Sequence, residues 1–98
     1  MPLETTKFDV QDHLKTPEDQ AAYIEAALET GDASFIAVAL GDIARARGVS
    51  AFAKDSGLSR EAIYKAFREG GNPTLDTLTK ATKALGLRLT VTAASTIS

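Results

Sequence analysis

Apolar residues recur at helical spacing along most of the chain, and each such stretch is bounded by residues that begin or end helices. The pattern predicts a first helix from Thr16-Pro17 to about Thr30, because threonine can cap it and proline needs no donor at the first helical position. Gly31 is expected to end it, and Asp32 to cap a second helix that reaches about Arg47. The second helix is apolar nearly all the way round, so we expect it to be central and buried. The residues expected to be buried in the first helix are Ala21, Ile24, Ala27 and Leu28.

Three shorter helices are predicted to follow. Ser50 should cap one that ends at Gly57, Ser59 should cap one that Gly70-Gly71 closes, and a last helix should run from Thr74 to Gly86. The inner face of the last helix is expected to consist of Leu75, Leu78, Ala81, Thr82 and Leu85.

From Leu87 the apolar period changes to two, which is typical of one short strand. Leu87, Leu89 and Val91 alternate with Arg88, Thr90 and Thr92. A lone strand leaves backbone groups unpaired, so its partner would be a second copy of the chain, the stretch Thr5–Val10 or another protein.

The predicted fold is therefore all-α, a bundle of about five helices with a short C-terminal β-strand. We expect an acidic N-terminal extension with one helix at 1–31, a helix-turn-helix domain at 32–86, and the strand and a tail at 87–98.

The helix expected after Ser59 has two contrasting sides. One arc holds Arg60, Glu61, Tyr64, Lys65 and Arg68, and the opposite arc holds Ala62, Ile63, Ala66 and Phe67. A helix that buries one side and presents cations and a tyrosine on the other suits insertion into a DNA major groove. Together with the short helix before Gly57, it predicts a helix-turn-helix that binds DNA.

The net charge of −2 is unevenly divided. Residues 1–44 carry two cations against nine anions, and residues 45–98 carry nine cations against four anions. This polarity indicates one anionic and one cationic partner, although an acidic half can also be simply solvated.

Several classes of function find no support in the residues. The chain of 98 residues suits one compact domain, it has no cysteine for a disulfide or a thiolate metal site, and its longest apolar stretch, Phe35–Leu40, is too short to cross a bilayer. The N-terminus lacks the layout of a secretory signal, so we expect a cytoplasmic protein without a membrane partner. His13 is the single histidine, and we interpret it and the nearby Asp9 and Asp12 as solvated polar residues rather than as metal ligands. We predict no enzyme, no catalytic residue, no metal and no cofactor.

The second half of the chain resembles the phage-repressor-like, Xre-type helix-turn-helix family. The residues that carry the likeness are Phe52-Ala53, Gly57-Leu58-Ser59, Ile63, Phe67, Gly70, Pro73-Thr74-Leu75, Leu78, Ala81 and Leu85-Gly86. Ala66 departs from the pattern, since such repressors often have a larger apolar residue there.

The chain over about residues 5–93 also resembles the antitoxins of HigA type, the addiction-module antidotes encoded beside a toxin of the RelE/ParE class. The likeness lies in FDVQDHLKTPEDQAAYIEAALETGD, FIAVALGDIARARGVSAFAKDSGLSREAIYKAF and GNPTLDTLTKATKALGLRLTV. This resemblance implies an antitoxin that binds its toxin and represses the shared operon through operator DNA.

We expect the DNA-binding residues to be Lys54, Ser59, Arg60, Glu61, Tyr64, Lys65, Arg68, Asn72 and Thr74. Arg60 and Glu61, in the first turn, are best placed for base edges, and Tyr64 faces outward beside them. The residues that favour the phosphate backbone are Lys54, Ser59, Lys65, Arg68, Asn72 and Thr74. Ser59 can equally serve only as a helix cap. The whole face can also be a solvated one with a Glu61–Lys65 pair.

The sequence leaves alternatives for the mode of toxin binding and for the dimer interface. An acidic set could cover the basic surface of the toxin, and it consists of Glu18, Asp19, Glu25 and Glu29. Strand addition through Leu87–Val91 to the toxin's sheet is the rival mode. A homodimer is expected, because it would present two recognition helices to successive grooves, and either Leu87–Thr92 or Phe35–Ile43 could form its interface.

The preferred interpretation is an antitoxin that also represses its own operon. The alternatives are a stand-alone prophage-type repressor without a toxin, and a protein-interaction module whose helix-turn-helix has lost DNA binding.

Overall fold

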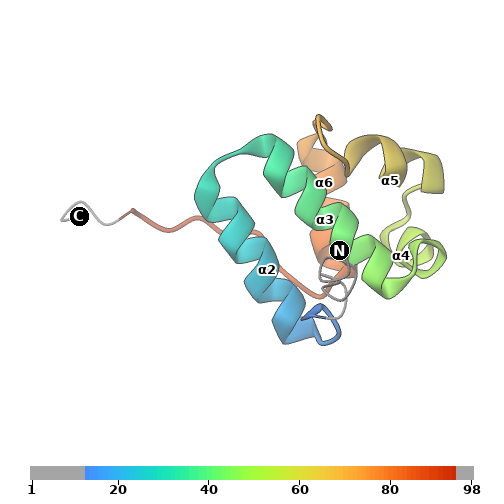
Figure 1. Ribbon diagram of the computed structural model, residues 1–98, viewed down its shortest axis with the longest axis horizontal. Helices are drawn as coiled ribbons and strands as arrows, with labels where there is room; N and C mark the ends of the chain where they lie inside the picture. The colour runs from blue at the N-terminus through green and yellow to red at the C-terminus, as the bar shows by residue number, and fades with distance from the viewer. Residues whose placement is uncertain (1–12, 95–98) are drawn as a thin grey trace, which may run out of the picture.

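The first two helices form an antiparallel hairpin against which the other helices pack (Figure 1). The computed structural model describes residues 13–94. Within this range lie the helices α2 (Pro17–Thr30), α3 (Ala33–Arg47), α4 (Val49–Ser56), α5 (Arg60–Ala66) and α6 (Leu75–Ala84), and no strand. The all-helical prediction is thus confirmed for the described residues.

Side-chain caps begin four of these helices, as the sequence predicts. The N–H groups of residues near the start of each helix donate to the caps, which are Thr16, Asp32, Ser59 and Thr74. At the other end of α2, Gly31 adopts a φ of 71°, a left-handed conformation that glycine tolerates without a steric penalty. The α2–α3 turn is therefore specified by local residues.

The predicted cap of α4 is wrong. Gly48, not Ser50, is the N-cap residue, and Ser50 lies exposed inside the first turn of the helix. The reason is the sharp reversal after α3: Gly48 has a φ of 94° and donates its N–H to the carbonyl of Arg45. One glycine thus ends α3 and leaves Val49 already helical.

The helix α5 is shorter than predicted. It ends at Ala66, and Phe67 leaves helical geometry with φ −105° and ψ 66°. This places the Phe67 side chain in the core, 2% exposed, with its ring in edge contact with that of Phe52 at 6.3 Å between centroids. Arg68 therefore lies beyond the helix instead of on its polar arc.

The core lies around α3, which is central as predicted. Ala37, Ala39, Leu40, Ile43 and Ala44 are each at most 1% exposed. From the other elements the core receives Leu14, Ile24, Ala27, Phe52, Ile63, Phe67, Ala81 and Leu85.

Two predicted burials need correction. Leu28 is 43% exposed and Leu75 is 73% exposed, because each lies where its helix extends past the core. Gln20, which the sequence does not predict to be buried, is 5% exposed, and its side-chain amide forms the hydrogen bonds described below.

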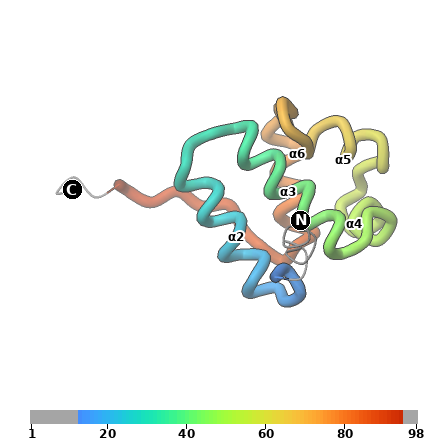
Figure 2. The backbone as a smooth tube through the Cα atoms, viewed as in Figure 1, coloured from blue at the N-terminus to red at the C-terminus, as the bar shows by residue number. Residues whose placement is uncertain are grey.

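The C-terminal β-strand is not seen. Residues 87–94 have no regular secondary structure, and the chain passes α2 and leaves the body of the molecule (Figure 2). A strand needs a second strand to pair with, and residues 13–94 supply none. The possible partner at Thr5–Val10 and the tail at 95–98 lie outside the described residues.

Candidate nucleic-acid interface

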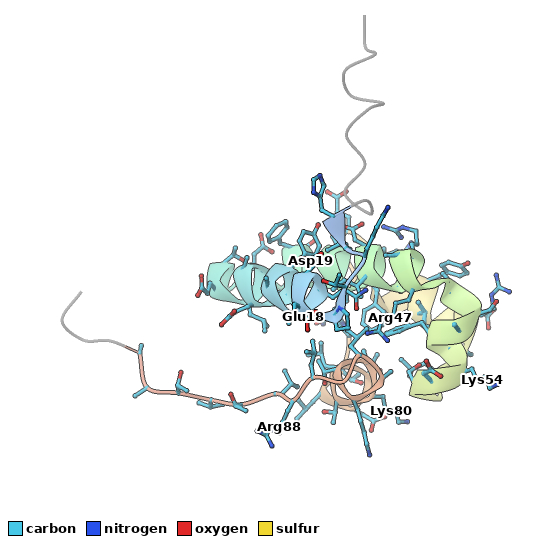
Figure 3. The ribbon with its side chains drawn as sticks, turned by 90° about the horizontal axis from the view of Figure 1, so that it is seen from below. Glu18, Asp19, Arg47, Lys54, Lys80 and Arg88 are labelled. Atoms are coloured by element: carbon cyan, nitrogen blue, oxygen red, sulfur yellow. The ribbon has the colours of Figure 1, made fainter. Side chains whose placement is uncertain are left out.

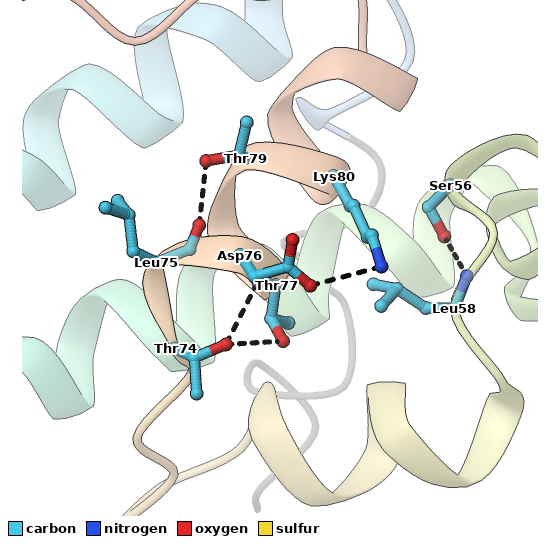
Figure 4. Close-up of polar contacts among 8 residues, drawn as sticks. All are labelled: Ser56, Leu58, Thr74, Leu75, Asp76, Thr77, Thr79 and Lys80. Atoms are coloured by element: carbon cyan, nitrogen blue, oxygen red, sulfur yellow. Dashed lines mark hydrogen bonds and ion pairs between the residues drawn. The ribbon is translucent and has the colours of Figure 1, made fainter.

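A three-residue turn joins α4 to α5. Gly57 has a φ of 79° and donates its N–H to the carbonyl of Ala53 at 2.9 Å, which ends α4. The next N–H, that of Leu58, donates to Ser56 Oγ at 3.1 Å (Figure 4), and the half-buried Leu58 side chain packs on the core. Ser59 Oγ then accepts the N–H of Ala62 at 3.0 Å and starts α5. This helix–turn–helix geometry is compatible with DNA binding.

The inner side of α5 is fixed against α3. Ile63 is 2% exposed beneath the helix, and Phe67 follows it into the core. Gly41 of α3 lies so close to the backbone of Phe67 that a Cβ atom at position 41 would overlap the Phe67 carbonyl oxygen. A further link joins the loop after α5 to α3, because the N–H of Gly70 donates to Ser34 Oγ at 2.9 Å. The orientation of α5 is therefore set by close packing.

All nine residues predicted to bind DNA are exposed. The structure brings five of them together on α5 and its cap: Ser59, Arg60, Glu61, Tyr64 and Lys65. Arg68 follows in the next turn, Asn72 and Thr74 lie between α5 and α6, and Lys54 lies on α4. Lys54 points outward at the α4 end of the molecule, far from Glu18 and Asp19 at the start of α2 (Figure 3).

Two of these residues are engaged as helix caps. Ser59 Oγ caps α5, and Thr74 Oγ1 accepts the N–H of Thr77 at 3.1 Å and lies 3.0 Å from its hydroxyl (Figure 4). The capping role expected as one alternative for Ser59 is thus present. Because the Ser59 hydroxyl accepts as a cap, its own proton remains a donor that a phosphate oxygen can use, whereas Thr74 donates its proton to Thr77 Oγ1.

The cations from Arg45 onward divide into engaged and available groups. Within residues 13–94, the ion pairs are Arg45–Asp42 at 2.6 Å and Lys80–Asp76 at 3.1 Å, so the expected Glu61–Lys65 pair does not form there. Arg47 is occupied by hydrogen bonds. Six cations stay outside these contacts: Lys54, Arg60, Lys65, Arg68, Lys83 and Arg88. Four of the six belong to the predicted DNA-binding set.

The sequence did not predict the contacts of Arg47. Its Nε donates to Gln20 Oε1 at 2.9 Å, and its two terminal nitrogens donate to the carbonyls of Ala84 and Leu85, each at 3.3 Å. Gln20 Nε2 in turn donates to the carbonyl of Leu14 at 2.9 Å. Arg47 thereby joins α2, α3 and the end of α6. The only sequence feature that accompanies these contacts is an arginine directly before the glycine that ends the helix.

A second polar network joins α2 to α3. The hydroxyl of Tyr23 donates to Asp42 Oδ2 at 2.7 Å, and Arg45 pairs with the other oxygen of the same carboxylate. Burial, followed by the hydrogen bond to Asp42 and its charge, raises the pKa of Tyr23 to about 12. The folded protein therefore favours the protonated phenol of Tyr23.

The acidic residues of α2 are all exposed. Glu18 and Asp19 lie in its first turn. Glu25 and Glu29 border a groove of about 550 Å³ between α2 and the C-terminal segment. The other lining residues are Ala21, Ile24, Leu28, Thr82, Leu87, Arg88, Leu89, Thr90 and Thr92.

Residues 13–94 offer neither a candidate metal site nor a candidate membrane span. No three histidine, cysteine, aspartate or glutamate residues there are placed to hold a metal ion, and Asp9 and Asp12 lie outside this range. None of the helices in that part of the chain is long and apolar enough to cross a membrane.

Comparison with known proteins gives two matches. One protein family, described as probable addiction module antidote protein, matches residues 4–93. An uncharacterized protein of Haemophilus influenzae is 46% identical over 84 residues, which cover 86% of this chain and 87% of the relative. No solved structure is significantly similar to the chain.

Proposed function

The chain belongs to the family of probable addiction module antidote proteins, and we propose that it is an antitoxin of HigA type that represses its own operon. In this proposal α4 and α5 form an Xre-type helix-turn-helix that binds operator DNA, and α2 takes part in binding a toxin of the RelE/ParE class. The protein acts in the cytoplasm as a regulator and not as an enzyme.

The exposed polar side of α5 is the observation that carries the DNA-binding part. Arg60 and Glu61 occupy the first turn, the end by which a recognition helix enters the major groove. Arg60 can pair with the edge of guanine, and Glu61 can accept from cytosine. Phosphate contacts fall to the neighbouring residues: Lys54, Ser59, Tyr64, Lys65, Arg68, Asn72 and Thr74.

A homodimer is part of the proposal, because one copy offers few free cations to the duplex. Two copies related by a two-fold axis would place their α5 helices in successive major grooves, about 34 Å apart. Such a protein recognises a palindromic operator.

The toxin-binding part rests on the charge of α2. A RelE/ParE-type toxin would present a basic surface, and Glu18, Asp19, Glu25 and Glu29 are exposed on one helix that could face it. Complementary charge of this kind speeds association and selects the partner.

The DNA-binding part is tested with a labelled fragment of the chain's own promoter. Arg60→Ala should weaken binding by about 10-fold or more, since a good arginine–base contact contributes roughly 1–3 kcal/mol. Lys83→Ala is the matched control, because Lys83 is an exposed cation on α6 outside the proposed surface. Binding should also weaken steeply as salt rises. Equal binding by both variants and the unmodified protein would contradict the proposal, and binding that fails altogether would favour a protein-interaction module.

The toxin-binding part is tested by co-expression with the product of the adjacent gene. Growth should be rescued and the two proteins should co-purify. A Glu18→Lys, Asp19→Lys variant should lose rescue while keeping operator binding, since it leaves α5 unchanged. Operator binding without any toxin to neutralise would instead indicate a stand-alone repressor.

A further inference from the structure

The backbone of residues 88–94 is free of hydrogen bonds within the described part of the chain. The last backbone bond runs from the N–H of Leu87 to the carbonyl of Thr82 at 2.9 Å. The segment beyond it exposes apolar side chains, with Leu89 at 39% and Val91 at 96% exposure. Unpaired backbone beside exposed β-branched and aliphatic residues is a template for strand pairing.

We propose that two copies of the chain pair through residues 87–91 as antiparallel strands, with the two-fold axis at Leu89. In an antiparallel pair, directly opposed residues lie on the same face. With the axis at Leu89, Leu87 opposes Val91 of the second copy and Leu89 opposes its own equivalent. All apolar residues then share one face, and Arg88, Thr90 and Thr92 share the other.

The alternation of the segment selects this register. An axis at Thr90 would place Leu87 opposite Ala93 and lose one large apolar pair. An axis between two residues would set leucines against threonines or Arg88, which mixes the faces. The register centred on Leu89 is the one that matches all three apolar residues with each other.

The groove beside α2 receives the second strand. Its apolar lining includes Ile24 and Leu28 from α2, and Leu28 is 43% exposed while the groove is open. The second copy would lay its apolar face over this lining and remove the Leu28 side chain from water, since Ile24 is already buried.

Charge complementarity favours the same occupant. Two carboxylates, Glu25 and Glu29, border the groove against the single guanidinium of Arg88. In the proposed register, Arg88 of the second copy lies opposite Thr90, itself a lining residue, so a second cation comes close to these carboxylates while its side chain belongs to the polar face of the pair. In the dimer the acidic set proposed to face a toxin reduces to Glu18 and Asp19, which do not line the groove.

This inference rests on the proposed homodimer and on nothing else in the proposed function. Self-association is measured without toxin or DNA. A protein that fails to bind toxin or operator can therefore still form this dimer, and a protein that fails to form this dimer can still bind toxin or operator.

Engineered cysteines test the register, because the chain has none of its own. A Leu89→Cys variant should form a disulfide-linked dimer in near-complete yield under mild oxidation, since the two positions oppose each other. Thr92→Cys is the matched control: its two copies would lie about 20 Å apart at about 3.4 Å per residue, too far for a disulfide. Equal cross-linking at both positions, or none at Leu89→Cys, would overturn the register.

Sedimentation of the full chain tests the interface. Leu89→Glu, Val91→Glu should raise the dimer dissociation constant by about 10-fold or more, because it sets like charges opposite each other at position 89 and a carboxylate against Leu87 at position 91. Leu75→Glu is the control, since it introduces a carboxylate at another exposed leucine, outside the segment. Circular dichroism should show all variants equally helical. A monomeric unmodified protein, or a dimer that both variants leave intact, would refute the proposal.

Discussion

Gly41 of α3 lies directly against the backbone carbonyl of Phe67, the residue that ends α5. The absence of a side chain at position 41 lets the central helix α3 approach the end of α5. The position of α5 therefore depends on a residue of another helix.

Replacing Gly41 by alanine should destabilise the protein. In most helix interiors this change stabilises by roughly 0.5–1 kcal/mol. Here the added Cβ would overlap a carbonyl oxygen, and overpacking of this kind costs about 1–3 kcal/mol. Urea unfolding measures the change in the free energy of unfolding. A stabilised variant would show that α3 and α5 can separate without loss.

Replacing Ser59 by aspartate separates its two possible roles. Aspartate caps a helix as well as serine does, so stability should change by less than about 0.5 kcal/mol. The new charge would repel a nearby phosphate, and operator binding should fall by about 10-fold. Thr16→Asp is the control, because it makes the same change at the cap of α2. Unchanged binding by Ser59→Asp would place the hydroxyl away from the DNA backbone.

Replacing Arg47 by alanine should lower the free energy of unfolding by about 2–4 kcal/mol. The change leaves Gln20 Oε1 and two carbonyls of α6 without their donor, and hydrogen bonds to charged groups contribute more than neutral ones. Arg45→Ala is the comparison, since Arg45 forms a half-exposed ion pair and should cost less than about 1 kcal/mol. Equal losses in the two variants would contradict the special role of Arg47.

Replacing Tyr23 by phenylalanine should change how stability depends on alkaline pH. Folding raises the pKa of Tyr23 from 10.0 to about 12, so it favours the protonated phenol. That contribution is complete below pH 10 and is lost as the pH rises through 12. Tyr23→Phe should be less stable by about 1 kcal/mol at pH 7, and the difference should shrink between pH 10 and 12. A constant difference in thermal midpoint across this range would rule out the linkage.

The helix starts were predictable because their causes are local. Thr16, Asp32, Ser59 and Thr74 each cap the helix that begins immediately after them, so a short window of sequence contains the whole interaction. The prediction that Ser50 caps α4 was wrong because the chain reverses at Gly48, so that α4 begins at Val49, one residue before Ser50.

What the sequence could not predict depends on distant residues. Helical spacing predicts Arg68 on the polar arc of a continuous helix, but the helix ends at Ala66 because the Phe67 side chain turns into the core, where its backbone packs against Gly41. The side chains of Gln20 and Arg47 form hydrogen bonds with each other and with residues distant in sequence, and no local sequence pattern predicts such contacts. The composition of the exposed α5 face was predictable, because helical spacing alone assigns its residues to one side.

The bonds from Arg47 to the carbonyls of Ala84 and Leu85 lie just before the chain turns at Gly86 and departs along α2. The guanidinium thus sets the angle at which the C-terminal segment leaves the helical body. If two such segments join and α5 binds DNA as proposed, that angle determines the separation of the two α5 helices, and with it the number of base pairs between operator half-sites.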